Sequence, residues 1–565
     1  MIRDDLIKHI GEILSDFTLS GAEVLLEHPA DLSHGDYATN VALVAAKEAG
    51  KNPHDLAESI AAQINENKPE SVERVEALGP GFINFHLSRD FFAESLAHAS
   101  KKEWGNNTTL ANTKVMVEYT DPNPFKEMHI GHVMSNTIGE SISRLVECSG
   151  AEVKRANYQG DMGLHVAKAI WGLQKTSGQT VDAARIGAAY AEGARAYEEG
   201  EQAKNEIEEI NRKLYAGKDE PEVNELYKEG RRVSLDHFEE IYQKLGTKFD
   251  YYFFESETGP LGKQIVHEHV NGVFEKSDGA VVFRGEKHGL HTRVFLTSEE
   301  LPTYEAKDLG LVVMKADTYP SDLYITITAS EQTDYFRVVK KALELMYPDL
   351  AEKVVHIAHG MMRLSGGKMS SRTGDVVTAE TLLNSVIERV NEKMKDTSMP
   401  DVNTVSEHIA VGAIKYSILK QSAGKDIVFD FEKSLSFEGD SGPYLMYSHA
   451  RARSVLEKAR AEGISPDTSG KKPAVSEVKR PAVSEVERLL YRFPEVVERA
   501  MKEYEPHYVA TFLTELAGSF NSYYAKEKII DGSPEAPYKL ALTDAFAETM
   551  KNGLWLLGIE APEKM

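Results

Sequence analysis

One stretch, residues 114–147, constrains the fold more than any other because it combines a strand, a rigid loop and the start of a helix. The apolar run 115–117 has the length of a buried strand. Pro122 and Pro124 then prevent a helix from beginning at once. Apolar residues at helical spacing follow residue 132. This order predicts the first strand, turn and helix of a nucleotide-binding α/β fold.

The helix of this stretch is expected to begin with His129-Ile130-Gly131-His132. Unpaired backbone N–H groups and the positive end of the helix dipole in a first turn favour an anion such as phosphate. Gly131 permits close approach of a ring or a phosphate, and the two imidazoles project from one side of the helix. Two histidines at this spacing also occur as ordinary surface or core pairs, so a partner motif is needed.

The partner motif begins at Lys368, about 240 residues later, and follows Gly366-Gly367. Together the two motifs resemble those of the class I aminoacyl-tRNA synthetases, which hold ATP with His-Ile-Gly-His and Lys-Met-Ser-Lys-Ser. The resemblance implies a Rossmann-like parallel-sheet core and catalytic roles for His129, His132, Lys126 and Lys368. It further implies an ATP site formed by His129, Gly131, His132, His359, Gly360, Met361, Lys368, Met369, Ser370 and Ser371.

Length and composition suggest a large cytoplasmic protein. With 565 residues the chain is expected to form about three domains. No apolar run approaches the length of a membrane helix, and the first residues lack the features of a secretory signal. Cys148 is the only cysteine, which excludes intrachain disulfides and thiolate metal clusters, and we expect it to be buried in a helix. No protein-bound metal is predicted.

The net charge of −24 does not favour a nucleic-acid partner, because Lys and Arg carry phosphate contacts. Charge is uneven along the chain, however, with 9 basic and 18 acidic residues in 1–112 but 17 and 18 in 445–565. An acidic protein can bind RNA through local basic faces. The charge therefore neither supports nor excludes a tRNA partner.

Three parts are predicted along the chain, an amino-terminal α+β domain (1–112), an α/β catalytic domain (113–400) and an all-α helical bundle (401–565). Charged helices are expected between about 165 and 250, and short strands between 251 and 300. Further strands of the core are predicted at 309–314, 324–327 and 354–357. A helical bundle after a class I core is the arrangement of an anticodon-binding domain.

Acidic residues near the predicted nucleotide turn suggest a cationic substrate. A side chain as large as arginine needs carboxylates that accept its planar fork of N–H donors. Segments around residues 118–123, 301–310 and 331–336, with the carboxy terminus and two amino-terminal segments, resemble arginyl-tRNA synthetase. In that family the matching residues hold arginine, with acidic groups on the guanidinium and amides at the other end. These residues are Glu118, Asn123, Tyr304, Asp308 and Gln332.

The resemblance implies a two-step reaction in which arginine and ATP, with Mg²⁺, form arginyl-adenylate, and the terminal adenosine of tRNA(Arg) then accepts the arginyl group. One departure from the family motif concerns the loop, where Ser371 replaces the second lysine. Many arginyl enzymes that lack this lysine carry one at the position of Lys126, which precedes His129 by three residues. Lys126 is expected to face the same phosphates, although a solvated loop charge is the alternative.

Resemblance also points to tRNA contacts at both ends of the chain, for which ordinary structural roles are equally open. Phe82 and Asn84 match the domain that contacts the outer corner of tRNA, but they would also suit a strand edge. Tyr444, Tyr447 and Met565 are expected at the anticodon, although a tyrosine could instead belong to the core.

The leading hypothesis is a monomeric arginine–tRNA ligase. A small-molecule nucleotidyltransferase that uses the same two motifs would not need the amino-terminal domain or the helical bundle. A non-catalytic tRNA-binding paralogue would be expected to have lost His129, His132 or Lys368, which this chain retains.

Overall fold

The computed structural model describes the whole chain except residues 20, 177–179, 217–220, 366–376, 396–400 and 468–482. It contains two compact units. One comprises Met1–Trp104, Arg451–Phe493 and Leu516–Thr549, and the other comprises Gly105–Ala450, Pro494–Glu515 and Met550–Met565. The predicted motif that begins at Lys368 lies within 366–376 and is therefore outside the described residues.

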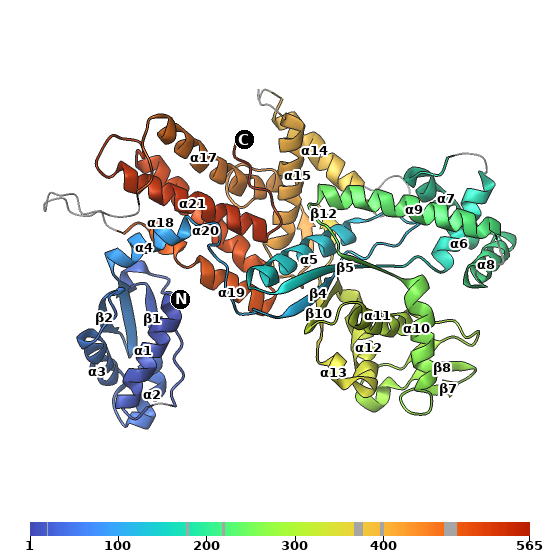
Figure 1. Cartoon of the computed structure of the whole chain (residues 1–565), viewed down its shortest axis with the longest axis horizontal. Coiled ribbons are helices and arrows are strands. Elements are labelled where there is room, and N and C mark those ends of the chain that lie inside the picture. Colours follow the sequence, from blue (N-terminus) through green and yellow to red (C-terminus); the bar gives the residue numbers. More distant parts are fainter. Residues whose placement is uncertain (20, 177–179, 217–220, 366–376, 396–400, 468–482) are drawn as a thin grey trace. The chain divides into compact units, whose positions relative to one another are not determined.

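A five-stranded parallel sheet forms the centre of the larger unit (Figure 1). Its spatial order is β11 (Val354–His359), β10 (Leu323–Ala329), β4 (Lys114–Glu118), β5 (Glu152–Gln159) and β6 (Tyr251–Phe254). All neighbouring strands are parallel. Because β4 comes first in the chain and lies in the middle, the connections leave it in opposite directions. Ligands bind at such a point, outside the carboxyl ends of the strands.

The central strand and the helix after it have the features expected of a buried βα unit. Four of the five residues of β4 are buried, and α5 (Ile130–Cys148) buries most of its side chains beside the sheet. Cys148 is buried at the end of α5, and burial raises the pKa of its thiol to about 12. The predicted strand at 115–117 and the helix beginning at the His129 turn are confirmed.

A group of charged helices interrupts the core, as predicted, and Figure 1 shows its four helices together. They are α6 (Leu164–Lys175), α7 (Ala183–Glu199), α8 (Glu201–Ala216) and α9 (Pro221–Lys244). Their shared apolar cluster includes Ile170, Ile186 and Ile207, and also Phe125 from the loop after β4. This loop is therefore anchored in the helical insertion as well as in the sheet.

One predicted strand is wrong, because residues 309–314 belong to helix α11 (Tyr304–Thr318). A short apolar run fits a buried helix as well as a buried strand, and only contacts distinguish the two. Here Gly310 and Gly262 allow α11 to pack closely on α10 (Glu255–Glu268), since a Cβ at residue 262 would lie 1.8 Å from the Ala306 carbonyl oxygen. The strand prediction failed because the packing partner, α10, lies outside the segment.

Smaller elements complete the larger unit. An antiparallel sheet of β7 (Glu275–Ser277), β8 (Ala280–Phe283) and β9 (Arg293–Leu296) confirms the short strands expected there. After β10 come α12 (Thr333–Met346) and α13 (Pro348–Ala351), and β12 (Met362–Leu364) pairs with β13 (Ile427–Phe429). Helices α14 (Ala379–Lys393), α15 (Val402–Leu419) and α16 (Phe431–Ser434) lie in the same unit.

The smaller unit contains the amino-terminal α+β structure. Its antiparallel sheet has the order β1 (Tyr37–Thr39), β3 (Phe82–Leu87), β2 (Val72–Leu78). The accompanying helices are α1 (Ile2–Asp16), α2 (Val41–Ala49), α3 (Pro53–Glu66) and α4 (Arg89–Ala99). Buried Asp36 pairs with Arg488 of α18 (Glu485–Leu490), and Arg89 pairs with Glu487. These ion pairs hold α18 on the amino-terminal structure.

The region 401–565 is mainly helical, as predicted, but it is not all-α, because the short strand β13 lies within it and pairs with β12. Its remaining helices are α17 (Gly442–Ala461), α19 (Phe493–Glu503), α20 (His507–Lys526) and α21 (Ala536–Leu556).

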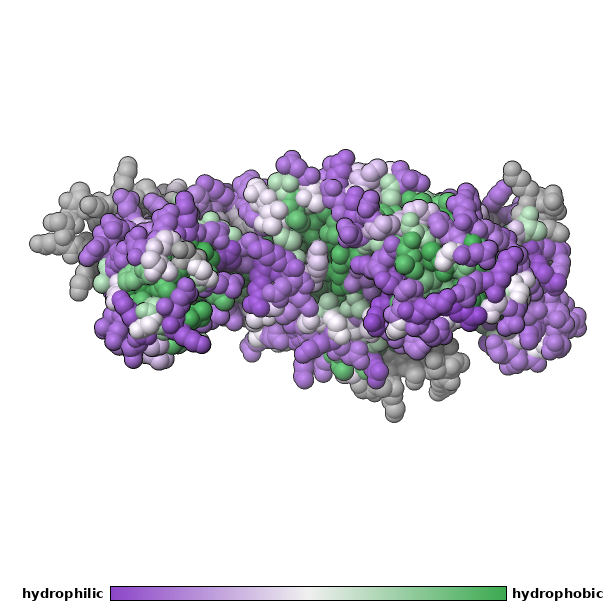
Figure 2. All heavy atoms as spheres, turned by 90° about the horizontal axis from the view of Figure 1, so that it is seen from below, coloured by the Kyte–Doolittle hydropathy of each residue, from purple (hydrophilic) through white to green (hydrophobic). Residues whose placement is uncertain are grey.

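No helix among the described residues is long and apolar enough to cross a membrane. On the face drawn in Figure 2, hydrophilic residues predominate and areas of hydrophobic residues lie between them.

Candidate active site

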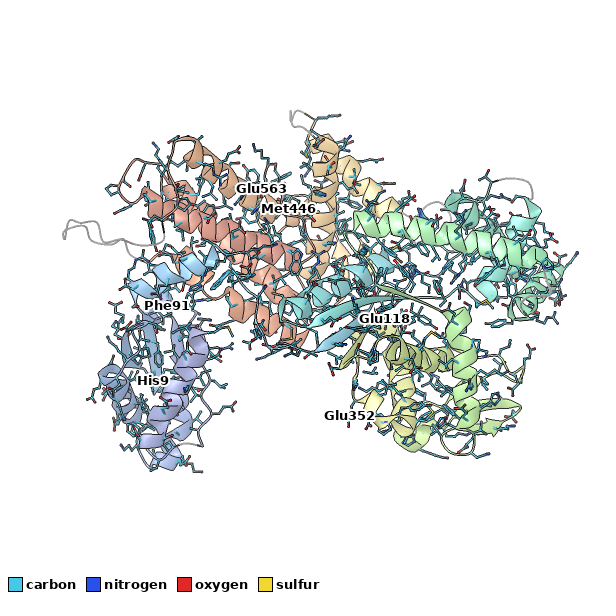
Figure 3. The ribbon with its side chains drawn as sticks, in the orientation of Figure 1. His9, Phe91, Glu118, Glu352, Met446 and Glu563 are labelled. Atoms are coloured by element: carbon cyan, nitrogen blue, oxygen red, sulfur yellow. The ribbon has the colours of Figure 1, made fainter. Side chains whose placement is uncertain are left out.

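A cavity of about 830 Å³ lies at the carboxyl ends of β4 and β10, where the sheet topology predicts a ligand. Glu118, labelled in Figure 3, ends β4 and contributes to its wall. The cavity brings together the predicted arginine- and ATP-binding residues that the structure describes, apart from Lys126. These are Glu118, Asn123, His129, Gly131, His132, Tyr304, Asp308, Gln332, His359, Gly360 and Met361.

The two histidines cap the helix that they begin. The Gly131 N–H donates to Nδ1 of His129 over 3.1 Å, and the His129 N–H donates to Nδ1 of His132 over 3.0 Å. The rings stack with their centroids 3.8 Å apart. An Nδ1 that accepts a hydrogen bond is unprotonated, so each neutral ring carries its proton on Nε2.

The prediction of open backbone N–H groups at this turn is wrong. Besides the two groups that the imidazoles accept, the Ile130 N–H donates to the Val377 carbonyl and the His132 N–H to that of His129. The helix dipole remains, but the donors that it presents are the Nε2–H groups of the two histidines. Imidazoles thus take the place of main-chain donors at this helix end.

Both imidazoles are held in the neutral form. Removal from water, and then the charge of Lys126, lowers the pKa of His129. Burial lowers the pKa of His132 well below its usual value, and His129 and Lys126 add to the shift. Neutral rings can act as hydrogen-bond donors to phosphate oxygens at physiological pH without proton transfer.

The segment that follows the predicted catalytic loop is tied to this turn. The Ala379 N–H donates to the Met128 carbonyl over 2.7 Å, and His129 forms a β-bridge with Thr378. The predicted ATP-binding residues Lys368, Met369, Ser370 and Ser371 lie outside the described residues. The chain nevertheless returns beside His129 directly after them.

The floor of the cavity contains a buried ion pair. Lys315 of α11 donates to Glu118 over 2.7 Å, and its ammonium also lies 3.3 Å from the Thr326 hydroxyl of β10. The side chains of Glu118 and Lys315 are only 3% and 2% exposed. Removing one partner of such a buried pair is strongly destabilising, so Lys315 is needed to hold Glu118 in the wall.

Two further carboxyls form no ion pair among the described residues, although the charge of Lys315 acts on both and favours a lower pKa. Burial raises the pKa of Asp308 to about 7; Tyr335 opposes this shift by donating its hydroxyl to the carboxylate, and the charge of Glu118 adds to it. Burial and Glu118 also raise the pKa of Asp121 well above its usual value. A cationic ligand in the cavity would relieve this repulsion.

The loops after β4 and β5 fit together closely. A Cβ at Gly160 would lie 2.2 Å from Oδ1 of Asn123 and 3.0 Å from Oε1 of Glu255. Glu255, the first residue of α10, accepts a hydrogen bond of 2.5 Å from buried Lys307. Gly160 therefore allows the Asn123 amide to reach the cavity beside this ion pair.

The end of β11 and the turn after it form another part of the cavity wall. The His359 Nδ1–H donates to the Gly360 carbonyl over 2.7 Å, and burial lowers the pKa of His359. A Cβ at Gly360 would lie 2.2 Å from the Lys425 carbonyl oxygen. The Met361 N–H donates to Asp426 over 2.8 Å, and the Met361 side chain is 36% exposed. This turn offers the cavity a glycine and a partly exposed apolar side chain, which suit a nucleotide base.

A second cavity of about 480 Å³ shares Tyr304 with the first. Lys126 belongs to this second cavity, where its ammonium lies 5.2 Å from the centre of the Tyr190 ring. Its charge still affects the pKa of His129 and His132, so it lies close to the nucleotide turn. The cavity wall also contains Lys168, His165, Tyr215 and Lys307.

The predicted tRNA-contact residues differ in exposure. Phe82 is 40% exposed on β3, whereas Asn84 on the same strand is 2% exposed. In the larger unit Tyr447 is exposed, and Tyr444 and Met565 are half-buried.

Sequence reasoning missed several side chains of the site. Asp121 and Tyr335 lay next to residues that were singled out, and their polar character was the only signal. Lys315 is separated from Glu118 by 197 residues, so no local pattern could have paired them. Glu255 and Lys307 lie on different helices, and no pattern of charged residues within either helix indicated that they would form a pair.

Among the described residues, no group of three or more His, Cys, Asp or Glu side chains is arranged to hold a metal ion. This includes the scattered histidines between 267 and 291.

Three family models together match nearly the whole chain. The model "tRNA synthetases class I (R), catalytic domain" matches residues 94–431, "Arginyl tRNA synthetase N terminal domain" matches 2–87, and "DALR anticodon binding domain" matches 445–565. With the parallel sheet and the histidine turn, these matches define a class I aminoacyl-tRNA synthetase, an enzyme class that uses ATP.

Relatives define the family within this class. The chain is 31% identical over 571 residues to the arginine–tRNA ligase of Ligilactobacillus salivarius, covering 97% of both chains. It is 30% identical to that of Halothermothrix orenii, covering 100% of this chain and 99% of the other. The solved arginyl-tRNA synthetase of Thermus thermophilus matches with a TM-score of 0.82 at 27% identity over 100% of both chains. The chain belongs to the arginyl-tRNA synthetase family.

Proposed function

We propose that this protein attaches arginine to tRNA(Arg) in two steps. Arginine and ATP form arginyl-adenylate and pyrophosphate, and the terminal adenosine of the tRNA then accepts the arginyl group with release of AMP. The observation that carries the proposal is one cavity that contains an anion-accepting histidine turn and an acidic wall. Such a cavity suits a nucleotide phosphate and a cationic amino acid side by side.

ATP would bind between the histidine turn and the His359–Met361 edge. The Nε2–H groups of His129 and His132 donate to phosphate oxygens, and Met361 and Gly360 lie against the adenine. Mg²⁺ would arrive with the nucleotide, because phosphates and water supply most of its ligands. Lys126 and Lys368 would add positive charge as the α-phosphate is attacked, and Met369, Ser370 and Ser371 belong to the same loop.

Arginine would lie deeper, with its guanidinium at Asp308 and Glu118. Planar N–H donors match carboxylates with two hydrogen bonds. Asn123 and Gln332 would hold the α-amino and carboxyl groups, and Tyr304 would cover the substrate. Because arginine brings one positive charge to a wall with two carboxyls that form no ion pair among the described residues, its binding is favoured over that of neutral amino acids.

The second cavity would receive the 3′ end of the tRNA. It adjoins the first at Tyr304, and Lys126, Lys168 and Tyr190 offer phosphates a positive charge and bases an aromatic face. Phe82 and Asn84 would contact the outer corner of the tRNA, and Tyr444, Tyr447 and Met565 its anticodon. For Asn84, burial requires that such a contact follow a local rearrangement of β3.

We further propose that the chain works as a cytoplasmic monomer with three functional parts, 1–112, 113–400 and 401–565. The family models at 2–87, 94–431 and 445–565 support this division. They also disfavour a small-molecule nucleotidyltransferase, which has no use for an anticodon-binding domain.

ATP–pyrophosphate exchange with each amino acid, with and without tRNA, tests the proposal. We expect exchange that depends on arginine and is stimulated by tRNA(Arg). Exchange with lysine or glutamate would overturn the specificity, and absence of any exchange would favour the non-catalytic paralogue.

A further inference from the structure

Asp161 is a buried acidic residue with no role so far in substrate binding. It follows Gly160 at the end of β5, and its side chain is fully buried. Ser256 donates to the carboxylate twice, from its N–H over 2.9 Å and from its hydroxyl over 2.8 Å. Tyr227 donates its hydroxyl over 2.8 Å, and the Arg231 guanidinium forms an ion pair over 3.0 Å. A buried carboxylate needs such partners, and here they come from two other elements.

One face of α9 supplies half of these partners. Tyr227, Gly230, Arg231 and Ser234 follow one another at spacings of three, one and three residues, so they form a single stripe along the helix. We call this set the α9 stripe. Arg231 also stacks on Phe254, with its guanidinium carbon 3.8 Å from the ring centre.

The other half of the stripe holds the loop after β4. The Phe125 N–H donates to the Ser234 hydroxyl over 3.0 Å, and Gly230 leaves room for the Phe125 ring, which a Cβ would approach to 2.2 Å. Phe125 has a φ of 67°, a conformation that needs support from its surroundings. One helix face thus fixes the loops that carry Asn123 and Lys126 on one side and Gly160 on the other.

Asp161 is connected through Ser256 to the residues between the two cavities. Ser256, which binds its carboxylate, follows Glu255 at the start of α10. Glu255 pairs with Lys307, one turn after Tyr304 on α11. The residues directly after Asp161, Met162 to His165, line the second cavity. The position of Asp161 therefore fixes Glu255 and Lys307 relative to residues 162–165 of the second cavity.

We propose that Asp161, held by the α9 stripe, is a positioning residue for the transfer of the arginyl group to tRNA. It fixes the wall of Glu255, Lys307 and Tyr304 relative to the second cavity, across which the terminal ribose of the tRNA must reach the adenylate. Asp161 lines neither cavity itself, so it acts through these neighbours. The inference rests on the proposed function.

The experiment compares Asp161→Asn and Tyr227→Phe with two controls on the same helix. Asp236→Asn and Arg232→Lys alter an exposed ion pair of α9, whose side chains are 66% and 64% exposed. Each full-length variant is assayed for ATP–pyrophosphate exchange with tRNA present, for aminoacylation, for arginine affinity by calorimetry and for thermal stability. The ratio of aminoacylation to exchange isolates the transfer step.

We expect the ratio to fall at least tenfold in Asp161→Asn and at least threefold in Tyr227→Phe, with arginine affinity within threefold of the wild type and both controls unchanged. A wild-type ratio in both variants would overturn the proposal, as would a ratio and an arginine affinity that fall together with thermal stability. If Asp161→Asn does not fold, Tyr227→Phe decides alone, because it removes only one hydroxyl. Failure of the wild-type protein to charge tRNA would instead refute the proposed function.

Discussion

Binding of arginine should depend on pH through Asp308. In the empty cavity burial raises the pKa of this carboxyl to about 7. A bound guanidinium favours the ionised form and lowers that pKa. Binding therefore releases a proton wherever Asp308 is protonated beforehand, and affinity is complete above pH 7 and lost as the pH falls below it.

The size of the effect follows from the pKa of the empty site. At pH 8 about nine tenths of the Asp308 carboxyls are ionised, and at pH 6 about one tenth, so the apparent Kd for arginine should rise roughly tenfold between them. Asp121, whose pKa burial and Glu118 also raise, would make the dependence steeper. In Asp308→Asn the loss of a buried charge pair should cost about 2–5 kcal/mol of arginine binding and remove this proton release.

Calorimetry of arginine binding between pH 6 and pH 8, in two buffers with different ionisation enthalpies, measures affinity and proton release together. Lysine, as a cation without the planar fork, is the ligand control. A Kd that stays constant over this range, or equal heats in the two buffers, would refute the assignment of Asp308 to the guanidinium.

Three further predictions concern residues around the same cavity. Lys126→Ala should cripple adenylate formation but leave arginine affinity nearly intact, and near-normal pyrophosphate exchange would contradict this. Gly160→Ala should weaken arginine binding at least tenfold, since the added Cβ would lie 2.2 Å from the Asn123 amide oxygen, and an unchanged Kd would show that this amide does not touch the substrate. Lys315→Met leaves buried Glu118 without a cation and should destabilise the protein by about 3–5 kcal/mol in denaturant unfolding; adding Glu118→Gln should recover part of this loss, and no recovery would argue against the pair.

Local sequence was sufficient where the signal lies in consecutive residues. The strand at 115–117, the loop after it and the helix beginning at His129 could be predicted, because the apolar run, the two prolines and the helical spacing follow one another along the chain. One prediction from the same stretch was wrong: the backbone N–H groups of the turn are not open to an anion, because the imidazoles accept hydrogen bonds from two of them. Histidine is not a usual capping residue, so a reading based on preferred caps did not anticipate it.

Packing between segments could not be predicted in the same way. The run 309–314 was expected to form a strand, but it belongs to helix α11, which packs closely on α10 at Gly262 and Gly310. A glycine in the sequence does not indicate which other helix will pack against it. The fit of Gly160 against Asn123 is of the same kind.

The sequence by itself determined the family, the nucleotide turn and the residue types that an arginine site requires, because these are properties of short segments and their order. Only the tertiary structure decided the charges in the cavity. Glu118 pairs with Lys315, whereas Asp308 and Asp121 form no ion pair among the described residues and have raised pKa values, and these differences arise from burial and from partners far away in the chain. The free energy of a buried charge depends on what surrounds it in space, and that is fixed only when the chain has folded.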